Sequence, residues 1–177
     1  MRIDVDRAAL VVVDVQEAFR PSVANFEPLA RASGVLVQAA REVGVPVIVT
    51  EQYPQGLGHT VGEVASHLAE GTEPIEKLTF SAASAAGFDL AGREQAIVCG
   101  IETHVCVSHT VLDLLEAGIE VHVVTDAVGS RAEANRELGL RKLERAGAVL
   151  TSVEMVVFEL VREAGTPEFK ALQGLVK

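Results

Sequence analysis

The feature that most constrains the fold is an alternation of short runs rich in valine and isoleucine with longer segments of helical periodicity. Apolar runs of strand length that separate helices are typical of a parallel sheet buried under helices on both faces. We therefore expect a three-layer α/β/α, Rossmann-like fold. The predicted strands are Ala9–Val15, Pro46–Thr50, Ile75–Leu78, Gln95–Gly100, Glu120–Thr125 and Val149–Thr151. The predicted helices are Pro28–Val43, Val61–Ala69, His104–Ala117, Ala132–Ala146 and Val153–Glu163, with a short closing turn around Pro167–Leu175.

Three glycines mark the ends of predicted helices, since Gly44, Gly118 and Gly147 each follow a helical run and precede a strand, as left-handed caps do. Each half of the chain supplies three strands, which predicts a six-stranded parallel sheet with the order 3-2-1-4-5-6. We expect one domain over residues 1–177, because this length leaves no room for a second. In such a sheet, ligands bind beyond the carboxyl ends of the strands where the order reverses, between the first and fourth strands.

The charge balance limits the partners. The 15 Lys and Arg residues against 25 Asp and Glu give a net charge of −10, which disfavours nucleic acid and anionic membranes. No apolar run approaches the roughly 18 residues of a membrane span. The start of the chain is acidic and lacks the basic and then apolar stretches of a signal peptide. We therefore expect a cytoplasmic protein that acts on a small molecule.

Three residues are candidates for chemistry. Asp14 ends the first predicted strand, and Cys106 follows the fourth strand in the first turn of a helix if Thr103 is the N-cap. Unpaired amides and the helix dipole there favour a thiolate, lowering the thiol pKa from about 8.5, and the same amides suit an oxyanion. Lys77, in the third strand, would keep the carboxylate ionised. The alternatives are a turn-capping acid, a small apolar side chain at a helix start and a lysine that snorkels from a sheet edge. Cys99, in the middle of a strand, is interpreted as core filler.

With these residues in place, the chain resembles the isochorismatase-like cysteine hydrolases, a superfamily that also contains nicotinamidases and carbamoyl-amide hydrolases. The resemblance covers nearly the whole chain. It rests on Val13-Asp14-Val15-Gln16 with Phe19, Glu76-Lys77 with Phe80-Ser81, Gly100-Ile101-Glu102-Thr103-His104-Val105-Cys106-Val107, and Val124-Thr125-Asp126-Ala127 with Ser130-Arg131. Most similar is the metal-independent subgroup of isochorismatase domain-containing proteins, which shares Thr50-Glu51-Gln52-Tyr53-Pro54, Gly56-Leu57-Gly58 and Thr60.

The resemblance implies a triad in which Cys106 is the nucleophile, Asp14 the general base and Lys77 the orienting cation. It also implies a cis peptide bond between Ile101 and Glu102, with the amides of Glu102 and Cys106 forming an oxyanion hole.

No metal or other cofactor is expected. Nicotinamidases hold a metal with an aspartate and a histidine after the second strand, where this chain has Gln52 and Pro54. His59 alone does not replace that ligand pair. The resemblance therefore disfavours nicotinamide as a substrate.

A retained Cys106 favours amide, imide or ester-like carbonyl chemistry over the vinyl ether cleavage of isochorismatases. The alternatives are vinyl ether hydrolysis and a non-catalytic interaction protein on the same fold. A dinucleotide-binding domain is disfavoured because no glycine follows the first strand, and an aspartyl phosphatase because Gln16 stands where a second acid is needed.

Aromatic residues gather in the segments that follow the first three strands. Phe19, Tyr53 and Phe80 are expected to line a substrate pocket, with Phe26 nearby. The alternative is that these rings fasten loops to the sheet.

The segment from Met155 to Val161 is apolar on more than one helical face. We expect this surplus to be buried in a homo-oligomer, a dimer or higher, with an active site near a subunit boundary. The alternative is that the closing segment Pro167–Leu175 covers the second face within one chain.

Overall fold

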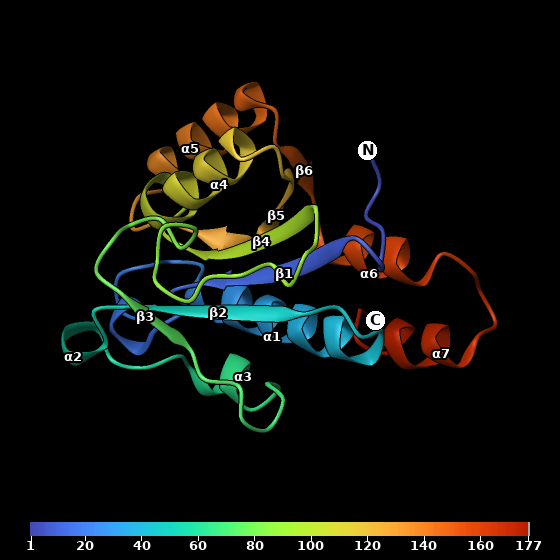
Figure 1. Cartoon of the computed structure of the whole chain (residues 1–177). Helices are drawn as coiled ribbons and strands as arrows, with labels where there is room; N and C mark the ends of the chain where they lie inside the picture. Colours follow the sequence, from blue (N-terminus) through green and yellow to red (C-terminus); the bar gives the residue numbers. More distant parts are fainter. Residues whose placement is uncertain (177) are drawn as a thin grey trace.

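The computed structural model describes residues 1–176 and contains a six-stranded parallel sheet with the strand order β3-β2-β1-β4-β5-β6 (Figure 1). The predicted strand order is confirmed. The strands are β1 (Ala8–Val13), β2 (Val47–Gln52), β3 (Ile75–Lys77), β4 (Gln95–Ile101), β5 (Glu120–Gly129) and β6 (Val149–Thr151).

The central strands β1 and β4 are buried along their whole length, as expected of parallel strands with helices on both faces. Alternate residues of β1 enter different cores. Leu10 and Val12 belong to the core beneath α1 (Phe26–Glu42), and Val11 and Val13 to the core beneath α4 (Ser108–Glu116). Successive side chains of β1 thus point to opposite faces of the sheet and contribute to the core on each face.

The remaining helices cover the two faces of the sheet. α4 and α5 lie on one face, and α1, α6 and α7 on the other (Figure 1). Their bounds are α2 (Pro54–Leu57), α3 (Gly62–Ala65), α5 (Glu133–Ala146), α6 (Val153–Val161) and α7 (Pro167–Gln173), with a 3₁₀ turn at Glu17–Phe19 and a π-helical turn at Thr103–Val107. The glycines predicted to cap helices, Gly44, Gly118 and Gly147, all have positive φ.

Two predicted segments differ from the structure. The helix predicted at Val61–Ala69 is a single turn, α3, because the amides of His67 and Leu68 bond three residues back and tighten the chain. The predicted strand ending at Thr125 continues to Gly129, since a register shift in β4 lets Ile101 pair with Gly129.

The helix α6 packs against two other helices within one chain, so its buried residues do not by themselves require an oligomer. Val157 is only 1% exposed within a single chain, because α1 and α7 pack against α6. The rings of Phe158 and Phe169 lie 6.3 Å apart, between α6 and α7. The closing helix thus covers part of the second apolar face of α6, as the alternative held, while Met155 and Phe158 remain 52% and 41% exposed. No helix among residues 1–176 is long and apolar enough to cross a membrane.

Candidate active site

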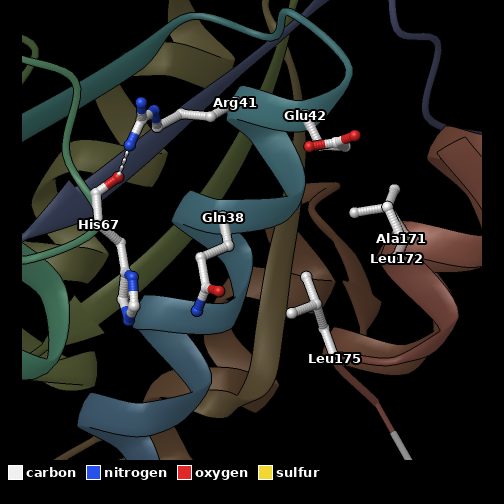
Figure 2. Close-up of a pocket in the computed structure, with 7 residues that line it drawn as sticks. All are labelled: Gln38, Arg41, Glu42, His67, Ala171, Leu172 and Leu175. Carbon is white, nitrogen blue, oxygen red and sulfur yellow. Dashed lines mark hydrogen bonds between the residues drawn. The ribbon is translucent and has the colours of Figure 1, made fainter.

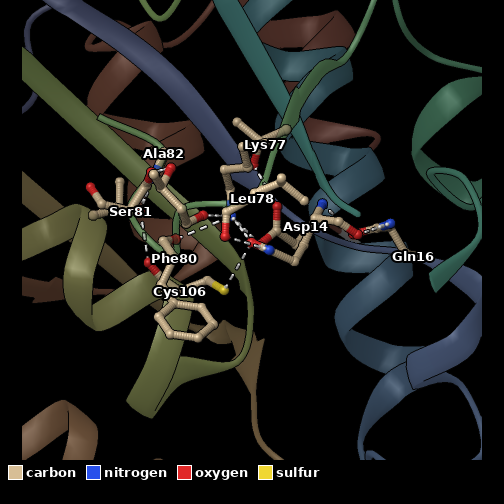
Figure 3. A network of polar contacts seen from close by, with 12 residues as sticks. Asp14, Gln16, Lys77, Leu78, Phe80, Ser81, Ala82 and Cys106 are labelled. Atoms are coloured by element: carbon tan, nitrogen blue, oxygen red, sulfur yellow. Dashed lines mark hydrogen bonds and ion pairs between the residues drawn. The ribbon is translucent and has the colours of Figure 1, made fainter. Parts of the chain in front are cut away.

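The three predicted catalytic side chains meet at the carboxyl edge of the sheet (Figure 3). Asp14 follows β1, Lys77 ends β3 and Cys106 lies in the turn after β4. The Lys77 Nζ donates a 2.7 Å hydrogen bond to the Asp14 Oδ2, and neither side chain is exposed. The Thr50 hydroxyl donates to the Asp14 Oδ1 at 2.7 Å, so both carboxylate oxygens are held.

Lys77 has its hydrogen-bonding capacity filled by the protein. Besides Asp14, its Nζ contacts the Gln52 Oε1 at 2.7 Å and the carbonyl oxygens of Phe80 and Thr79 at 3.1 and 3.2 Å. An ammonium has only three N–H donors. The lysine therefore orients Asp14 and is not free to bind a substrate carboxylate.

Gln52 is a site residue that sequence reasoning missed. Its Oε1 accepts from Lys77 and also from the Cys106 thiol, at 3.9 Å from Sγ. Its Nε2 donates to the Leu78 carbonyl at 3.0 Å, which fixes the amide orientation. The backbone amide of Gln52 donates to the Oε1 of the buried Gln16 at 2.8 Å. The signal available was its position at the end of the strand between those of Asp14 and Lys77, where it was considered only as a missing metal ligand.

The helix start at Cys106 differs from the prediction. Glu102, not Thr103, is the N-cap, and the chain enters a π-helical turn before α4 begins at Ser108. The Thr103 hydroxyl donates to the Gly129 carbonyl at 3.1 Å instead of capping the turn.

The expected lowering of the thiol pKa is also not found. Burial, then the neighbouring Asp14 carboxylate, raises the pKa of Cys106 to about 12, although Lys77 acts in the opposite direction. Desolvation of a thiolate outweighs the helix dipole here, since Cys106 is only 6% exposed. The resting thiol is protonated, which makes a base necessary.

One backbone feature that the resemblance implies is present next to the turn that carries Cys106. The Ile101–Glu102 peptide bond is cis. The Glu102 carbonyl accepts hydrogen bonds from the amides of Val105 and Val107, at 3.0 and 3.2 Å, on either side of the Cys106 amide. Gly100 lets β4 approach β1 here, because a Cβ at this position would lie 1.9 Å from the Val13 carbonyl oxygen.

The aromatic residues expected to line a pocket separate into two groups. Tyr53 and Phe80 are 51% and 53% exposed, and Phe80 lies on the Cys106 side of the site, with its ring 5.8 Å from that of His109 (Figure 3). Phe19 packs against the core beneath α1, and Phe26 is buried in that core. Phe26 therefore fastens the chain, as the alternative held.

Within residues 1–176, no three His, Cys, Asp or Glu side chains gather in a way that would hold a metal ion. The Nδ1 of His59 lies 3.0 Å from the Glu51 Oε2, and this carboxylate also accepts from the Thr60 amide and hydroxyl. These bonds hold the loop after β2.

A separate groove of about 410 Å³ lies at the C-terminal end of α1, against the last helix (Figure 2). It is lined by Gln38, Arg41, Glu42, His67, Ala171, Leu172 and Leu175. Because α1 leads into β2, this groove is at the amino edge of the sheet and shares no residue with the triad.

The fold and this arrangement of residues agree with the family comparison. The isochorismatase domain model matches residues 8–155. The chain belongs to the isochorismatase family. It is 41% identical to isochorismatase domain-containing protein 2A of Mus musculus, over 99% of this chain and 85% of that protein. It is 40% identical to a secreted isochorismatase effector of Phytophthora sojae, over 96% and 84% of the two chains.

Solved structures give the same family. A MAR1 ribonuclease from Caenorhabditis elegans is 41% identical, with a TM-score of 0.93 over 99% of this chain and 92% of that one. The YcaC product of Escherichia coli, described as an octameric hydrolase of unknown specificity, is 26% identical with a TM-score of 0.88 over 99% and 90%. YcaC from Pseudomonas aeruginosa, solved with hexane-2,5-diol and covalent acrylamide, is 30% identical with a TM-score of 0.84 over 98% and 91%. The chain is therefore an isochorismatase-like hydrolase.

Proposed function

We propose that this protein hydrolyses a small amide, imide or ester-like substrate with Cys106 as the nucleophile. The observation that carries the proposal is the buried pair of Asp14 and Lys77, joined by a 2.7 Å hydrogen bond, next to a buried and protonated thiol. A structural cysteine needs no such pair, whereas a nucleophile of high pKa needs a base at hand.

In the proposed first step, Asp14 takes the proton of the Cys106 thiol as Sγ attacks the substrate carbonyl carbon. The carbonyl oxygen becomes an oxyanion, which the amides of Glu102 and Cys106 would stabilise. As the tetrahedral intermediate collapses, the C–N or C–O bond breaks. The leaving amine or alcohol takes the proton from Asp14, and an acyl thioester remains on Cys106.

In the second step, Asp14 removes a proton from a water molecule that attacks the thioester. The thiolate leaves and takes that proton from Asp14, which returns Asp14 to the carboxylate, and the carboxylic acid product is released. Lys77, which donates to the Asp14 Oδ2, keeps the carboxylate aligned. Gln52 contacts both Lys77 and the thiol, so we assign it the role of keeping the two aligned.

The cations at the site favour an uncharged substrate. Lys77 is held by four protein oxygens, and the Arg131 guanidinium pairs with Glu102 at 3.0 Å. Isochorismate carries two carboxylates, and Lys77 has no N–H donor left to bind one.

A ribonuclease activity is the second candidate, because the similar structure from Caenorhabditis elegans is called a ribonuclease. The net charge of −10 and the engagement of Lys77 by protein oxygens disfavour binding of a polyphosphate backbone. We therefore place carbonyl hydrolysis first.

The test is a panel of small amides, imides and esters, with an oligoribonucleotide included, scored for turnover by the parent protein and by Cys106→Ala. We expect Cys106-dependent turnover of at least one carbonyl compound, and we expect it to persist in the presence of a chelator. Cleavage of RNA with no carbonyl turnover would contradict the proposal, and so would activity lost with a bound metal.

We further propose that the protein is a homo-oligomer with the site near a subunit boundary. Three exposed apolar side chains surround the carboxyl edge at β3, namely Tyr53, Leu78 and Phe80, and one relative is an octamer. A single species at the monomer mass of 18.7 kDa in sedimentation at micromolar concentration would contradict this.

A cytoplasmic location is also proposed. Both cysteines are unpaired, and two unpaired thiols suit a reducing compartment. Since one relative is secreted, cell fractionation is the check.

A further inference from the structure

A second buried carboxylate borders the cysteine, and the proposed chemistry does not use it. Glu102 is 6% exposed and immediately precedes the turn that carries Cys106. After burial and the charge of Asp14, the negative charge of Glu102 also helps to raise the pKa of the thiol. A residue whose amide is assigned to an oxyanion hole thus has a side chain that opposes thiolate formation.

The Glu102 carboxylate forms an ion pair with Arg131, which lies on the connection between β5 and α5. The Glu102 Oε1 accepts two hydrogen bonds from Arg131, from its backbone amide at 2.8 Å and from its Nε at 3.0 Å. The Glu102 side chain is 7% exposed and that of Arg131 is 62% exposed. The arginine therefore brings a positive charge from the surface to a buried carboxylate.

This ion pair belongs to a wider contact between two segments. The Thr103 hydroxyl donates to the Gly129 carbonyl at 3.1 Å, and the His104 Nδ1 lies 3.0 Å from the Ser130 Oγ. Three consecutive residues, 102–104, are thus tied to three consecutive residues, 129–131. These hydrogen bonds fix the turn that carries Glu102 and Cys106 against the connection between β5 and α5.

We infer that Arg131 is a positioning residue for the nucleophile: by neutralising the buried Glu102 carboxylate, its guanidinium favours ionisation of Cys106. This inference rests on the proposed function, in which Cys106 gives up its proton during the reaction. A substitution at position 131 can remove the positive charge without releasing Glu102, because the backbone amide of residue 131 still donates to the Glu102 carboxylate.

The sign of the effect follows from the charges around the thiol. Asp14 and Glu102 disfavour the thiolate, and Lys77 favours it. Arg131 pairs with Glu102. Without the guanidinium, the negative charge of Glu102 acts uncompensated on the thiolate. At an effective dielectric intermediate between protein and water, this weakens thiolate formation by roughly threefold to tenfold.

The test is the rate of Cys106 alkylation by iodoacetamide between pH 7 and 9, measured by mass spectrometry of the Cys106 peptide in the intact full chain. Below the thiol pKa the rate follows the thiolate fraction, so a change in pKa displaces the whole profile. The variants are Arg131→Gln, Glu102→Gln and the double variant. Arg141→Gln is the matched control, since it removes one positive charge from the exposed face of α5, where Arg141 lies 3.9 Å from Glu137.

We expect Arg131→Gln to slow alkylation threefold to tenfold, Glu102→Gln to accelerate it, and the double variant to be at least as fast as the parent. Arg141→Gln should match the parent. The inference is overturned if Arg131→Gln matches Arg141→Gln. It is also overturned if the double variant stays as slow as Arg131→Gln, because that result indicates a purely structural role.

Hydrolysis by the same variants separates this inference from the proposed function. We expect Arg131→Gln to lower kcat with little change in KM, because no substrate contact is removed. If neither the parent protein nor any variant hydrolyses a compound of the panel, the proposed function fails. The alkylation rates still show whether the charge of Arg131 affects ionisation of Cys106.

Discussion

The two cysteines lie on the same strand-and-turn unit, and their surroundings differ in one decisive way. Burial raises the pKa of both Cys99 and Cys106 to about 12, so neither thiol is ionised at rest. Cys99 is fully buried inside β4 and faces Ser33, whereas Cys106 sits just past the end of β4 beside Asp14 and Lys77. The comparison indicates that an adjacent base, and not a low resting pKa, distinguishes a nucleophile from core filler.

The largest expected effect is the loss of activity on replacing Cys106. Cys106→Ala should reduce hydrolysis to the uncatalysed background, because no other group can form the acyl intermediate. Cys106→Ser should fail nearly as completely, since a hydroxyl is far harder to ionise by the same base. Steady-state kinetics on the best substrate from the panel measures both.

Cys99→Ala is the matched control, since it removes a thiol of equally raised pKa that lies away from the base. It should keep kcat/KM within about twofold of the parent, because it touches no group at the site. If Cys106→Ala turned over substrate at the parent rate, or if Cys99→Ala were equally inactive, the difference between the two cysteines would not be catalytic.

A smaller effect, with opposite signs in two assays, is expected for Asp14→Asn. Hydrolysis should slow by roughly 10²–10⁴-fold, because the general base is lost at nearly constant shape. Alkylation of Cys106 should accelerate, because the negative charge that raises the thiol pKa is removed while Lys77 remains. Residual hydrolysis should increase with pH, since the variant depends on the thiolate formed in solution.

Parallel decreases in both assays after Asp14→Asn would contradict the role of base, because they would indicate a displaced thiol. Thr50→Val is the structural control. It removes the hydroxyl that donates to the Asp14 Oδ1 but keeps the carboxylate. It should change alkylation less than Asp14→Asn does.

The fold could be predicted from sequence because its signals are local and repeated. Apolar runs fill all of β1 and all of β4 after Gln95, which identifies both as buried strands, and glycines at 44, 118 and 147 mark helix ends. The strand order followed from the even division of strands between the halves. The short α3 was missed because apolar spacing alone does not distinguish a tight turn from a full helix.

The site was predicted less completely, because its chemistry depends on burial and on contacts distant in sequence. The helix-start argument gave the wrong direction for the Cys106 pKa, since desolvation and Asp14 are not visible in the local sequence. Gln52 was missed for the same reason. Its amide has a role only once β2 lies between the strands that carry Asp14 and Lys77. For Glu102, the sequence predicted a role only for the backbone amide and none for the side chain.

The smallest expected effect concerns the surroundings of Cys99. The Ser33 hydroxyl is fully buried in α1 and has no strong hydrogen-bond partner among the described residues, since the group beside it is the weakly hydrogen-bonding thiol of Cys99. A buried hydroxyl without a partner costs about 1–3 kcal/mol, so Ser33→Ala should raise the free energy of unfolding by about 1 kcal/mol at unchanged activity. The matched control is Ser108→Ala, which removes a buried hydroxyl that donates to the Thr103 carbonyl at 2.8 Å. It should lower the free energy of unfolding by about 1 kcal/mol, because that carbonyl loses a partner. Urea titration measures both changes.

Equal destabilisation by the two substitutions would mean that Ser33 has a polar partner. The surroundings of Cys99 would then be more polar than the structure shows, although they would still lack a base such as the Asp14 beside Cys106.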